Sequence, residues 1–409
     1  MNAPGRSLTR KVFAFAWSAI LIGLITLLML EVVLRVIGFS RTILYEPDSL
    51  IGWSGRPGAE GIYRDEGRAE IGMSSAGVRD RERTVAKPRD VWRVAVLGDS
   101  FTEALQVAED KRFTSVMEGL LTECDAGKGR RVEVLNFGVS GFGTAQEYLL
   151  LKDRVLSYAP DVIVLAFLPG NDITDNVRAL DQSLASRPYV TLNGSGQLAW
   201  DRSFEDSPSF RIKSSAIFRA VLLASDFSRV IQGAFFVHDK WRMKRTAEAG
   251  KKTSKQIEQG LSDGQYAPPR TLEWQQAWKI TEKLIEKMNS LTTHSGARFL
   301  LVTLSSGIQV QPDAKRSAEA AARLGVADLF YADDRLQAFA VQKKIEVVSL
   351  ARPLAEYARR ENVFLHGFPE TTLGSGHWNE KGHQAAGELI ARYLCRRPAS
   401  GKAPDPAPS

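Results

Sequence analysis

Metal-binding patterns are missing from this sequence. It has only two cysteines and five histidines in 409 residues. Cys and His do not cluster at ligand spacing, and there is no H-E-x-x-H segment. No internal repeat is visible either. Nothing in the chain therefore indicates a metal or a cofactor.

Basic residues only slightly outnumber acidic ones. Lys and Arg number 54 against 47 Asp and Glu, which gives a net charge of +7. A nucleic-acid-binding domain gathers its basic residues in a patch or motif, but here they are scattered and no recognition motif accompanies them. We therefore expect no nucleic-acid partner. With 44% hydrophobic residues, the chain can bury a full core in one large domain or two smaller ones.

One long apolar segment stands out near the N-terminus. The nineteen residues of Val12–Leu30 carry no charge, and this is about the length that a helix needs to cross the hydrocarbon core of a bilayer. Arg6, Arg10 and Lys11 precede the segment. The positive-inside rule then places residues 1–11 in the cytoplasm.

We expect residues 12–34 to form an uncleaved transmembrane anchor. The protein would cross the inner (cytoplasmic) membrane once, with everything after about residue 40 in the periplasm or outside. A cleaved signal peptide is the alternative, but no small-x-small cleavage site follows the apolar run, and Glu31-Val32-Val33-Leu34-Arg35 comes instead.

Two further segments have a composition of their own. Residues 41–90 are rich in Gly, Pro, Arg and Glu and show little periodicity, which predicts an extracytoplasmic lead-in of ordered loops that wraps the edge of the next domain. Residues 396–409 are rich in Pro and Ala, and we expect a disordered tail there.

Between them, apolar runs alternate with helical patterns. The runs are typical of buried parallel strands, and they comprise Val91–Leu97, Val132–Phe137, Val162–Phe167, Phe299–Leu304 and Ile345–Leu350. Alternation of this kind predicts an α/β fold, a parallel sheet with helices on both faces. A helix is expected after Asp110 as N-cap. Residues 175–270, which include a strand-like Tyr189–Leu192, form an insertion in the sheet domain.

Reactive groups in open α/β sheets gather at the carboxyl ends of the strands. The first three strands end in GDSFT (98–102), NFGVSG (136–141) and GND (170–172). A serine on a tight turn after a strand can face solvent beside a free backbone N–H, which can stabilise an oxyanion. The segment is not a G-x-S-x-G elbow, so the ordinary α/β-hydrolase fold is excluded. Near the C-terminus, GHWNEKGH (376–383) precedes a final amphipathic helix.

These four segments, in this order, resemble the four blocks of the SGNH (GDSL-like) hydrolases. The resemblance covers roughly residues 92–175 and 297–394. It implies that Ser100 is the nucleophile and an oxyanion donor through its N–H, that Gly141 and Asn171 are further donors, and that His377 is the base. It also implies a flavodoxin-like three-layer α/β/α sandwich over residues 91–395.

One position departs from the resembled pattern. The family carries an aspartate three residues before the histidine, and here that residue is Gly374. A triad acid orients the imidazole and stabilises its charged form. Glu370, the nearest carboxylate upstream, is one candidate for this role. The other arrangement is a dyad, in which a backbone carbonyl or water accepts the second ring N–H of His377.

The resemblance implies an ester hydrolase, and the expected envelope location suggests acyl esters, above all O-acetyl groups, on a cell-envelope polysaccharide. The substrate would be such an acylated glycan or a small ester. Two alternatives stay open: an O-acyltransferase acting on an envelope polysaccharide, and a non-catalytic glycan-binding or assembly subunit.

The implied fold also bears on Cys124 and Cys395, which stand at the ends of the first and last helices of the domain, and these helices are expected side by side on one face of the sheet. A disulfide is one arrangement. Two unpaired buried thiols are the other, and we favour them because the sequence does not test the Cα separation that a bridge requires.

Overall fold

The computed structural model of the chain describes residues 5–181, 183, 185–250, 256–258, 260–371 and 373–396. The described part ends at Arg396, so the predicted disordered tail at 396–409 lies outside it except for that first residue.

The centre of the domain is a five-stranded sheet in which all neighbouring strands are parallel. Its strands are β5 (Val91–Gly98), β6 (Arg131–Gly138), β7 (Val162–Phe167), β10 (Arg298–Thr303) and β11 (Glu346–Ser349). The spatial order is β11-β10-β7-β5-β6. Numbered along the chain, this is the 2-1-3-4-5 order of the flavodoxin-like fold. The fold class and the five strands predicted from the sequence are therefore confirmed.

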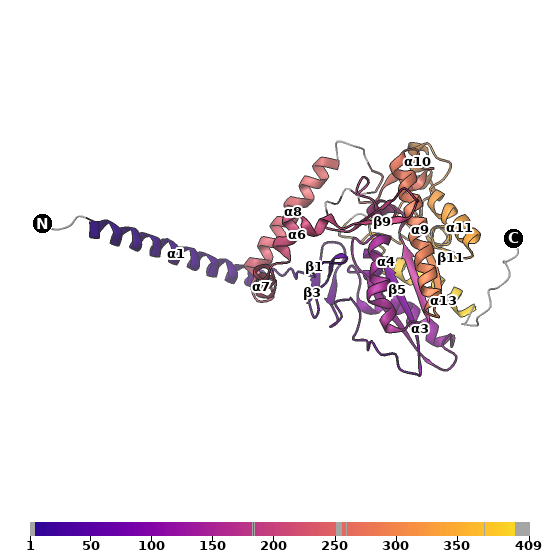
Figure 1. The fold of residues 1–409 in the computed structure, drawn as a ribbon, viewed down its shortest axis with the longest axis horizontal. Coiled ribbons are helices and arrows are strands. Elements are labelled where there is room, and N and C mark those ends of the chain that lie inside the picture. Colours follow the sequence, from indigo (N-terminus) through magenta and orange to yellow (C-terminus); the bar gives the residue numbers. More distant parts are fainter. Residues whose placement is uncertain are drawn as a thin grey trace.

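Helices cover both faces of this sheet (Figure 1). One face is packed by α3 (Phe113–Glu123), α12 (Ala351–Glu361) and α13 (Glu380–Arg396). The other is packed by α4 (Thr144–Asp153), α9 (Leu272–His294) and α11 (Tyr331–Lys343). The short helices α2 (Ser100–Glu103) and α5 (Pro169–Asp172) follow β5 and β7, and α10 (Ala314–Leu324) precedes α11.

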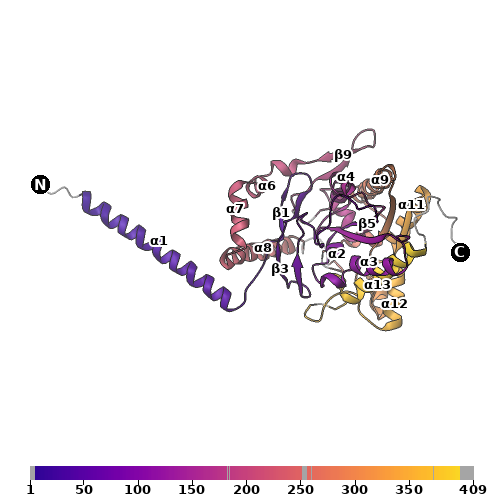
Figure 2. The same ribbon diagram turned by 90° about the horizontal axis from the view of Figure 1, so that it is seen from below.

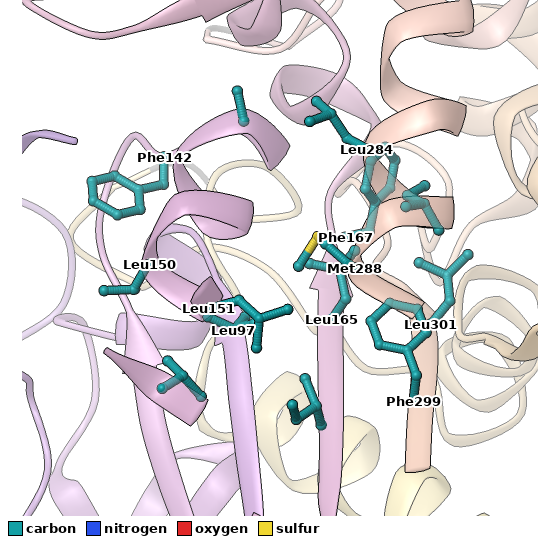
Figure 3. Close-up of a cluster of buried hydrophobic side chains, with 14 of the residues drawn as sticks. Leu97, Phe142, Leu150, Leu151, Leu165, Phe167, Leu284, Met288, Phe299 and Leu301 are labelled. Carbon is teal, nitrogen blue, oxygen red and sulfur yellow. The ribbon is translucent and has the colours of Figure 1, made fainter. Parts of the chain in front are cut away.

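Alternation along the strands explains the two layers. In β7, Ile163, Leu165 and Phe167 point to the α4 and α9 side, where they meet Leu284 and Met288 (Figure 3). Their neighbours Val162, Val164 and Ala166 point to the other face. Every residue of β7 is buried, which is why the strand reads as a continuous apolar run instead of an alternating one.

The first helix of the sheet domain begins later than predicted. Asp110 is not its N-cap, because Glu109–Lys111 forms a separate 3₁₀ turn. Helix α3 begins at Phe113, with Arg112 as the N-cap residue and no side-chain capping bond.

The lead-in at 41–90 contains strands, contrary to the prediction of loops alone. Antiparallel pairs form between β1 (Tyr45–Asp48) and β2 (Gly52–Gly55), and between β3 (Glu60–Tyr63) and β4 (Ala69–Gly72). Each strand has four residues, too few for a period-two pattern to be recognised. Both pairs lie against one side of the sheet domain (Figure 2).

The described residues of the insertion at 175–270 contain one strand pair and three α-helices. The predicted strand at Tyr189–Leu192 is present as β8 and pairs with β9 (Leu198–Asp201). Helices α6 (Pro208–Lys213), α7 (Ala216–Ser225) and α8 (Arg229–Gly250) follow.

Helix α1 (Gly5–Val36) extends away from the domain (Figures 1 and 2). Its segment Arg10–Val36 is long and apolar enough to cross a membrane, and none of its most apolar stretch is buried in the protein. The anchor expected at residues 12–34 lies inside this segment.

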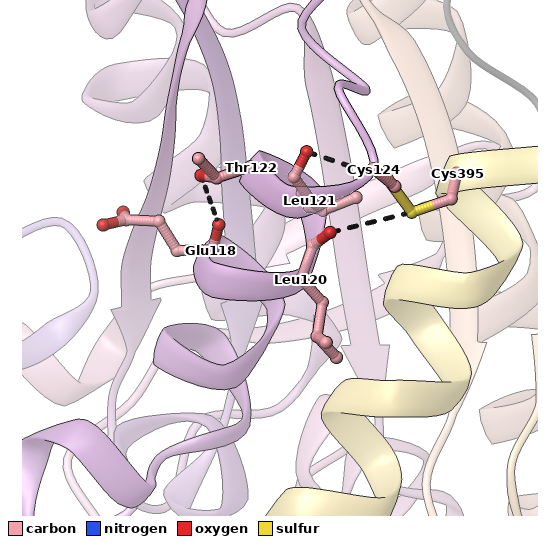
Figure 4. The surroundings of a disulfide bond; sticks show 6 residues. All are labelled: Glu118, Leu120, Leu121, Thr122, Cys124 and Cys395. Atoms are coloured by element: carbon pink, nitrogen blue, oxygen red, sulfur yellow. Dashed lines mark hydrogen bonds between the residues drawn. A yellow bond between two sulfur atoms is a disulfide. The ribbon is translucent and has the colours of Figure 1, made fainter.

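Cys124 and Cys395 form a disulfide with a Cα–Cα distance of 6.0 Å, so our preference for two free thiols was wrong. Helices α3 and α13 pack side by side, and both sulfurs lie at the same end of that pair (Figure 4). The link joins positions 271 residues apart.

Candidate active site

Ser100 begins helix α2 directly after the carboxyl end of β5. The turn is held by Asp99, the N-cap residue, whose carboxylate accepts the Phe101 N–H at 2.9 Å. Asp99 is fully buried, and this burial raises the pKa of its carboxyl despite the hydrogen bonds that it accepts. The strand-to-helix turn thus fixes the serine by a buried cap.

The predicted nucleophile and base lie in contact. The Oγ of Ser100 is 2.8 Å from Nε2 of His377, a hydrogen-bonding distance suited to proton transfer. His377 belongs to the loop before α13, 277 residues further along the chain.

The other ring nitrogen of His377 contacts Glu66, a residue that the sequence analysis did not single out. Nδ1 lies 2.5 Å from Oε2 of Glu66, and the backbone N–H of His377 donates to Oε1 at 2.9 Å. Glu66 comes from the turn between β3 and β4 in the lead-in.

The proposals that Glu370 or a dyad completes the site are corrected by this contact, since Glu66 already occupies Nδ1. The backbone at Gly374 also disfavours an acid at that position. Gly374 has φ of +87°, and a Cβ on it would lie 2.9 Å from the side-chain amide of Gln311. An aspartate would need both a left-handed backbone and space that is taken.

Hydrogen bonding fixes the tautomer of the histidine. Burial alone would raise the pKa of Glu66, but the hydrogen bonds and charge of His377 outweigh it and hold that pKa below its usual value. An ionised carboxylate can only accept, so Nδ1 carries the proton. Nε2 is then left as the acceptor for the Ser100 hydroxyl, which is the state a general base requires.

Hydrogen bonds from His366 hold the loop that carries His377. Nδ1 of His366 lies 2.7 Å from the Gly376 carbonyl, and its Nε2 lies 3.2 Å from Oγ of Ser305. Burial lowers the pKa of His366 to about 4, so the ring is neutral and donates to the carbonyl. Gly376 itself has φ of +82°, and a Cβ there would lie 2.3 Å from Oε1 of Glu66.

Two backbone N–H groups can serve an oxyanion. In the described part of the chain, neither the N–H of Ser100 nor that of Gly141 has a hydrogen-bond acceptor. Glu103 holds the segment before Gly141, because its buried carboxylate accepts the Ser140 N–H at 2.8 Å and the Tyr45 hydroxyl at 2.5 Å.

Asn171, the third predicted donor, lies beside the serine turn. Its amide nitrogen donates to Asp99 at 2.9 Å and lies 3.5 Å from the Phe142 carbonyl. The second contact is too long for a strong hydrogen bond, so one amide hydrogen has no good acceptor in this arrangement.

Two more buried carboxyls adjoin this turn, on Glu147 and Asp172. Burial raises the pKa of both well above the usual value, and mutual repulsion with the Asp99 charge adds to the rise. Both oxygens of Glu147 lack a hydrogen-bond partner in the described residues. Burial therefore favours the neutral form of both carboxyls.

A cavity of about 450 Å³ opens at the serine and histidine. Its walls come from the lead-in, the sheet domain and α8. Polar and charged side chains on these walls include Arg41, Tyr63, Asp65, Gln106 and Asp239.

The sequence therefore located four of the five groups in this arrangement. Ser100, Gly141, Asn171 and His377 follow strands or precede a helix, where position alone is informative. Glu66 stands in a short turn, 311 residues from the histidine. A carboxylate in a glycine-bearing turn was the only local signal for it, and such turns are common.

No family model matches the chain, and no curated protein matches it. Solved structures similar to it include an acetyl xylan esterase (14% identity, 74% of this chain and 98% of that one, TM-score 0.38). An acetylxylan esterase from Geobacillus stearothermophilus (12%, 74% and 94%, TM-score 0.37) and a GDSL-like lipase from Bacteroides thetaiotaomicron (12%, 76% and 92%, TM-score 0.33) are also similar. Because these scores and identities are low, the flavodoxin-like fold is assigned from the strand order of this chain itself.

Proposed function

We propose that this chain is a serine esterase of the SGNH type, with Ser100 as nucleophile, His377 as general base and Glu66 as the acid. The observation that carries the proposal is the continuous contact from Glu66 through the ring of His377 to the Ser100 hydroxyl, at the mouth of a cavity. This is the triad arrangement required for nucleophilic acyl transfer.

In the first half-reaction, Oγ of Ser100 attacks the carbonyl carbon of the ester and its proton passes to Nε2 of His377. Glu66 stabilises the imidazolium that forms. The carbonyl oxygen becomes an oxyanion, for which the N–H groups of Ser100 and Gly141 and the amide of Asn171 are the donors. Collapse breaks the bond to the alcohol, which takes the proton from Nε2 and leaves.

In the second half-reaction, water attacks the acyl-serine while His377 removes one of its protons. The second tetrahedral intermediate uses the same donors. Its collapse releases the carboxylic acid, and Ser100 recovers its proton from Nε2. The enzyme returns to its starting protonation state.

The chain would be anchored by α1 in the cytoplasmic membrane, with residues 1–11 inside and the catalytic domain in the periplasm or outside. The length of Arg10–Val36 and the basic residues around its start support this orientation. The disulfide between Cys124 and Cys395 supports an oxidising compartment.

The proposed substrate is an acyl ester, in particular an O-acetyl ester, on a cell-envelope polysaccharide. Support comes from polar side chains on a partly apolar cavity wall, since Arg41, Tyr63, Asp65 and Gln106 offer donors and acceptors suited to sugar hydroxyls. A short acetyl group would need little apolar space beside Ser100.

The test is covalent labelling of the full-length protein in detergent with a fluorophosphonate, followed by mass spectrometry of the peptides. Label on Ser100, together with loss of aryl acetate hydrolysis in Ser100→Ala, is expected. Wild-type turnover in Ser100→Ala would refute Ser100 as the nucleophile. Folded wild-type protein that shows neither label nor turnover would refute the esterase and favour the non-catalytic subunit. Transfer of the acetyl group to an added glycan in preference to water would identify an acyltransferase.

A further inference from the structure

Helix α7 (Ala216–Ser225) exposes the side that a soluble helix normally makes polar. Its buried residues Leu222 and Ser225 lie on one side. Ile217 and Leu223 on the opposite side are 80% and 65% exposed. The exposed residues Ala216, Ala220, Val221 and Ala224 extend this apolar surface, and Arg219 is the one charged residue of α7 exposed among them. An outward apolar stripe of this kind needs a covering partner.

The stripe continues into the corner between α7 and α8. Phe227 in this corner is 79% exposed, although a large aromatic ring gains much from burial. The axes of the two helices differ by 112° across the break. Together, α7 and the corner form what we call the α7 face: Ala216, Ile217, Ala220, Val221, Leu223, Ala224 and Phe227.

The last turns of α1 hold this corner directly. Nη2 of Arg35 donates to the Phe227 carbonyl at 2.5 Å. The carboxylate of Glu31 accepts the N–H groups of Arg229 and Val230 at 3.0 Å each. The α7 face is therefore fixed at the end of the helix that would cross the membrane, and α7 lies on the side of the domain turned toward α1 (Figure 2).

Basic residues outnumber acidic ones in this region. The segment 208–227, which reaches the end of the α7 face, contains Arg211, Lys213 and Arg219 and one acidic residue, Asp226, which pairs with Arg56. Apolar residues flanked by Lys and Arg characterise helices that lie in the interface of an anionic bilayer. With ten residues, α7 is about 15 Å long and cannot cross a hydrocarbon core of about 30 Å.

We propose that the α7 face lies in the headgroup layer of the same membrane that α1 spans. The partner is the lipid surface itself, and the inference rests on the membrane anchoring proposed above. The observation that favours lipid over a second protein is the direct bonding of the corner to Glu31 and Arg35 of α1.

The position of the α7 face in the headgroup layer determines which substrates the active site can reach. Phe235 and Asp239 of α8 line the catalytic cavity with Arg41, five residues after α1. At 1.5 Å per residue, Phe235 is only about 9 Å along α8 from Arg229 at the corner. The cavity is thus held near headgroup level, where it would act on an ester presented at the membrane surface, such as a lipid-linked glycan.

The test places an environment-sensitive fluorophore on single introduced cysteines, Ile217→Cys and Leu223→Cys, in the full-length protein. The matched control is Val341→Cys. Val341 is 67% exposed in the wild type, and its helix, α11, lies at the end of the domain remote from α1 (Figure 1). The native cysteines are paired and do not react. The proteins are reconstituted in phosphatidylglycerol/phosphatidylcholine vesicles with or without lipids that carry a doxyl quencher near the headgroup.

We expect the quenching lipid to reduce emission several-fold more at 217 and 223 than at 341. Equal, weak quenching at all three positions would overturn the proposal. So would shielding of 217 and 223 that depends on protein concentration and not on the quencher, because it would identify a second copy as the partner. The measurement is repeated in the Ser100→Ala background, so its outcome is independent of whether the chain is an esterase.

Discussion

Glu66 and His377 form two hydrogen bonds with each other across 311 residues of sequence, one at Nδ1 and one at the backbone N–H. The acid therefore fixes both the ring and the loop that carries it. In the proposed reaction, catalysis by the sheet domain would therefore depend on a turn in the lead-in at residues 41–90.

Glu66→Gln is expected to lower kcat by about 100-fold to 10,000-fold with little change in KM, because the carboxylate matters most when His377 is charged. Steady-state kinetics with an aryl acetate measures this split. Glu370→Gln is the matched control and should retain wild-type turnover. The reverse result, with Glu370→Gln impaired and Glu66→Gln active, would contradict the assignment of the acid.

Asn171→Ala is expected to lower kcat by on the order of 100-fold to 1000-fold, the effect of losing one oxyanion donor. Because the substrate carbonyl carries little negative charge, KM should change less. Asn193→Ala serves as control, since Asn193 makes its hydrogen bonds within the turn that joins β8 to β9. An Asn171→Ala protein that keeps wild-type kcat would leave the two backbone N–H groups as the sufficient donors.

The parts of the site that could be predicted are those tied to strand ends. Ser100, Gly141 and Asn171 each follow an apolar run, and parallel strands bring their carboxyl ends to one edge. Glu66 could not be found this way. Its position depends on how the two strand pairs β1–β2 and β3–β4 pack against the sheet domain. No local sequence pattern encodes that packing.

The disulfide could not be predicted from the sequence for the same reason. The sequence places Cys124 and Cys395 after helices on one face of the sheet, but a bridge depends on the separation of two Cα atoms. That distance follows from the packing of α3 against α13, in which Gly387 of α13 would place a Cβ 2.8 Å from Val116. A glycine that permits such close approach has no distinctive pattern around it.

The double variant Cys124→Ser/Cys395→Ser should be less stable than the wild type by about 2 to 5 kcal/mol, since the crosslink restricts a long loop in the unfolded chain. Denaturant unfolding of the detergent-solubilised protein measures the difference. A reductant should destabilise the wild type and leave the double variant unaffected. Equal stability of both proteins without reductant would show that the bond contributes nothing.

The last prediction concerns the carboxyl of Glu147, which is fully buried and has no hydrogen-bond partner among the residues that the structure describes. Burial raises its pKa well above the usual value of 4.5. Above about pH 4.5 the unfolded chain loses this proton while the folded protein keeps it. The unfolded state then binds fewer protons, so the group's contribution to stability falls as the pH rises.

Glu147→Gln keeps the shape of the side chain and removes this titration. The variant should be as stable as the wild type near pH 4, and its advantage should grow as the pH rises toward 8. Denaturant unfolding at pH 4, 6 and 8 measures the gap, with Glu123→Gln on the exposed end of α3 as control. A stability difference that is the same at all three pH values would mean that Glu147 is not held protonated, because only a difference in bound protons makes the gap depend on pH.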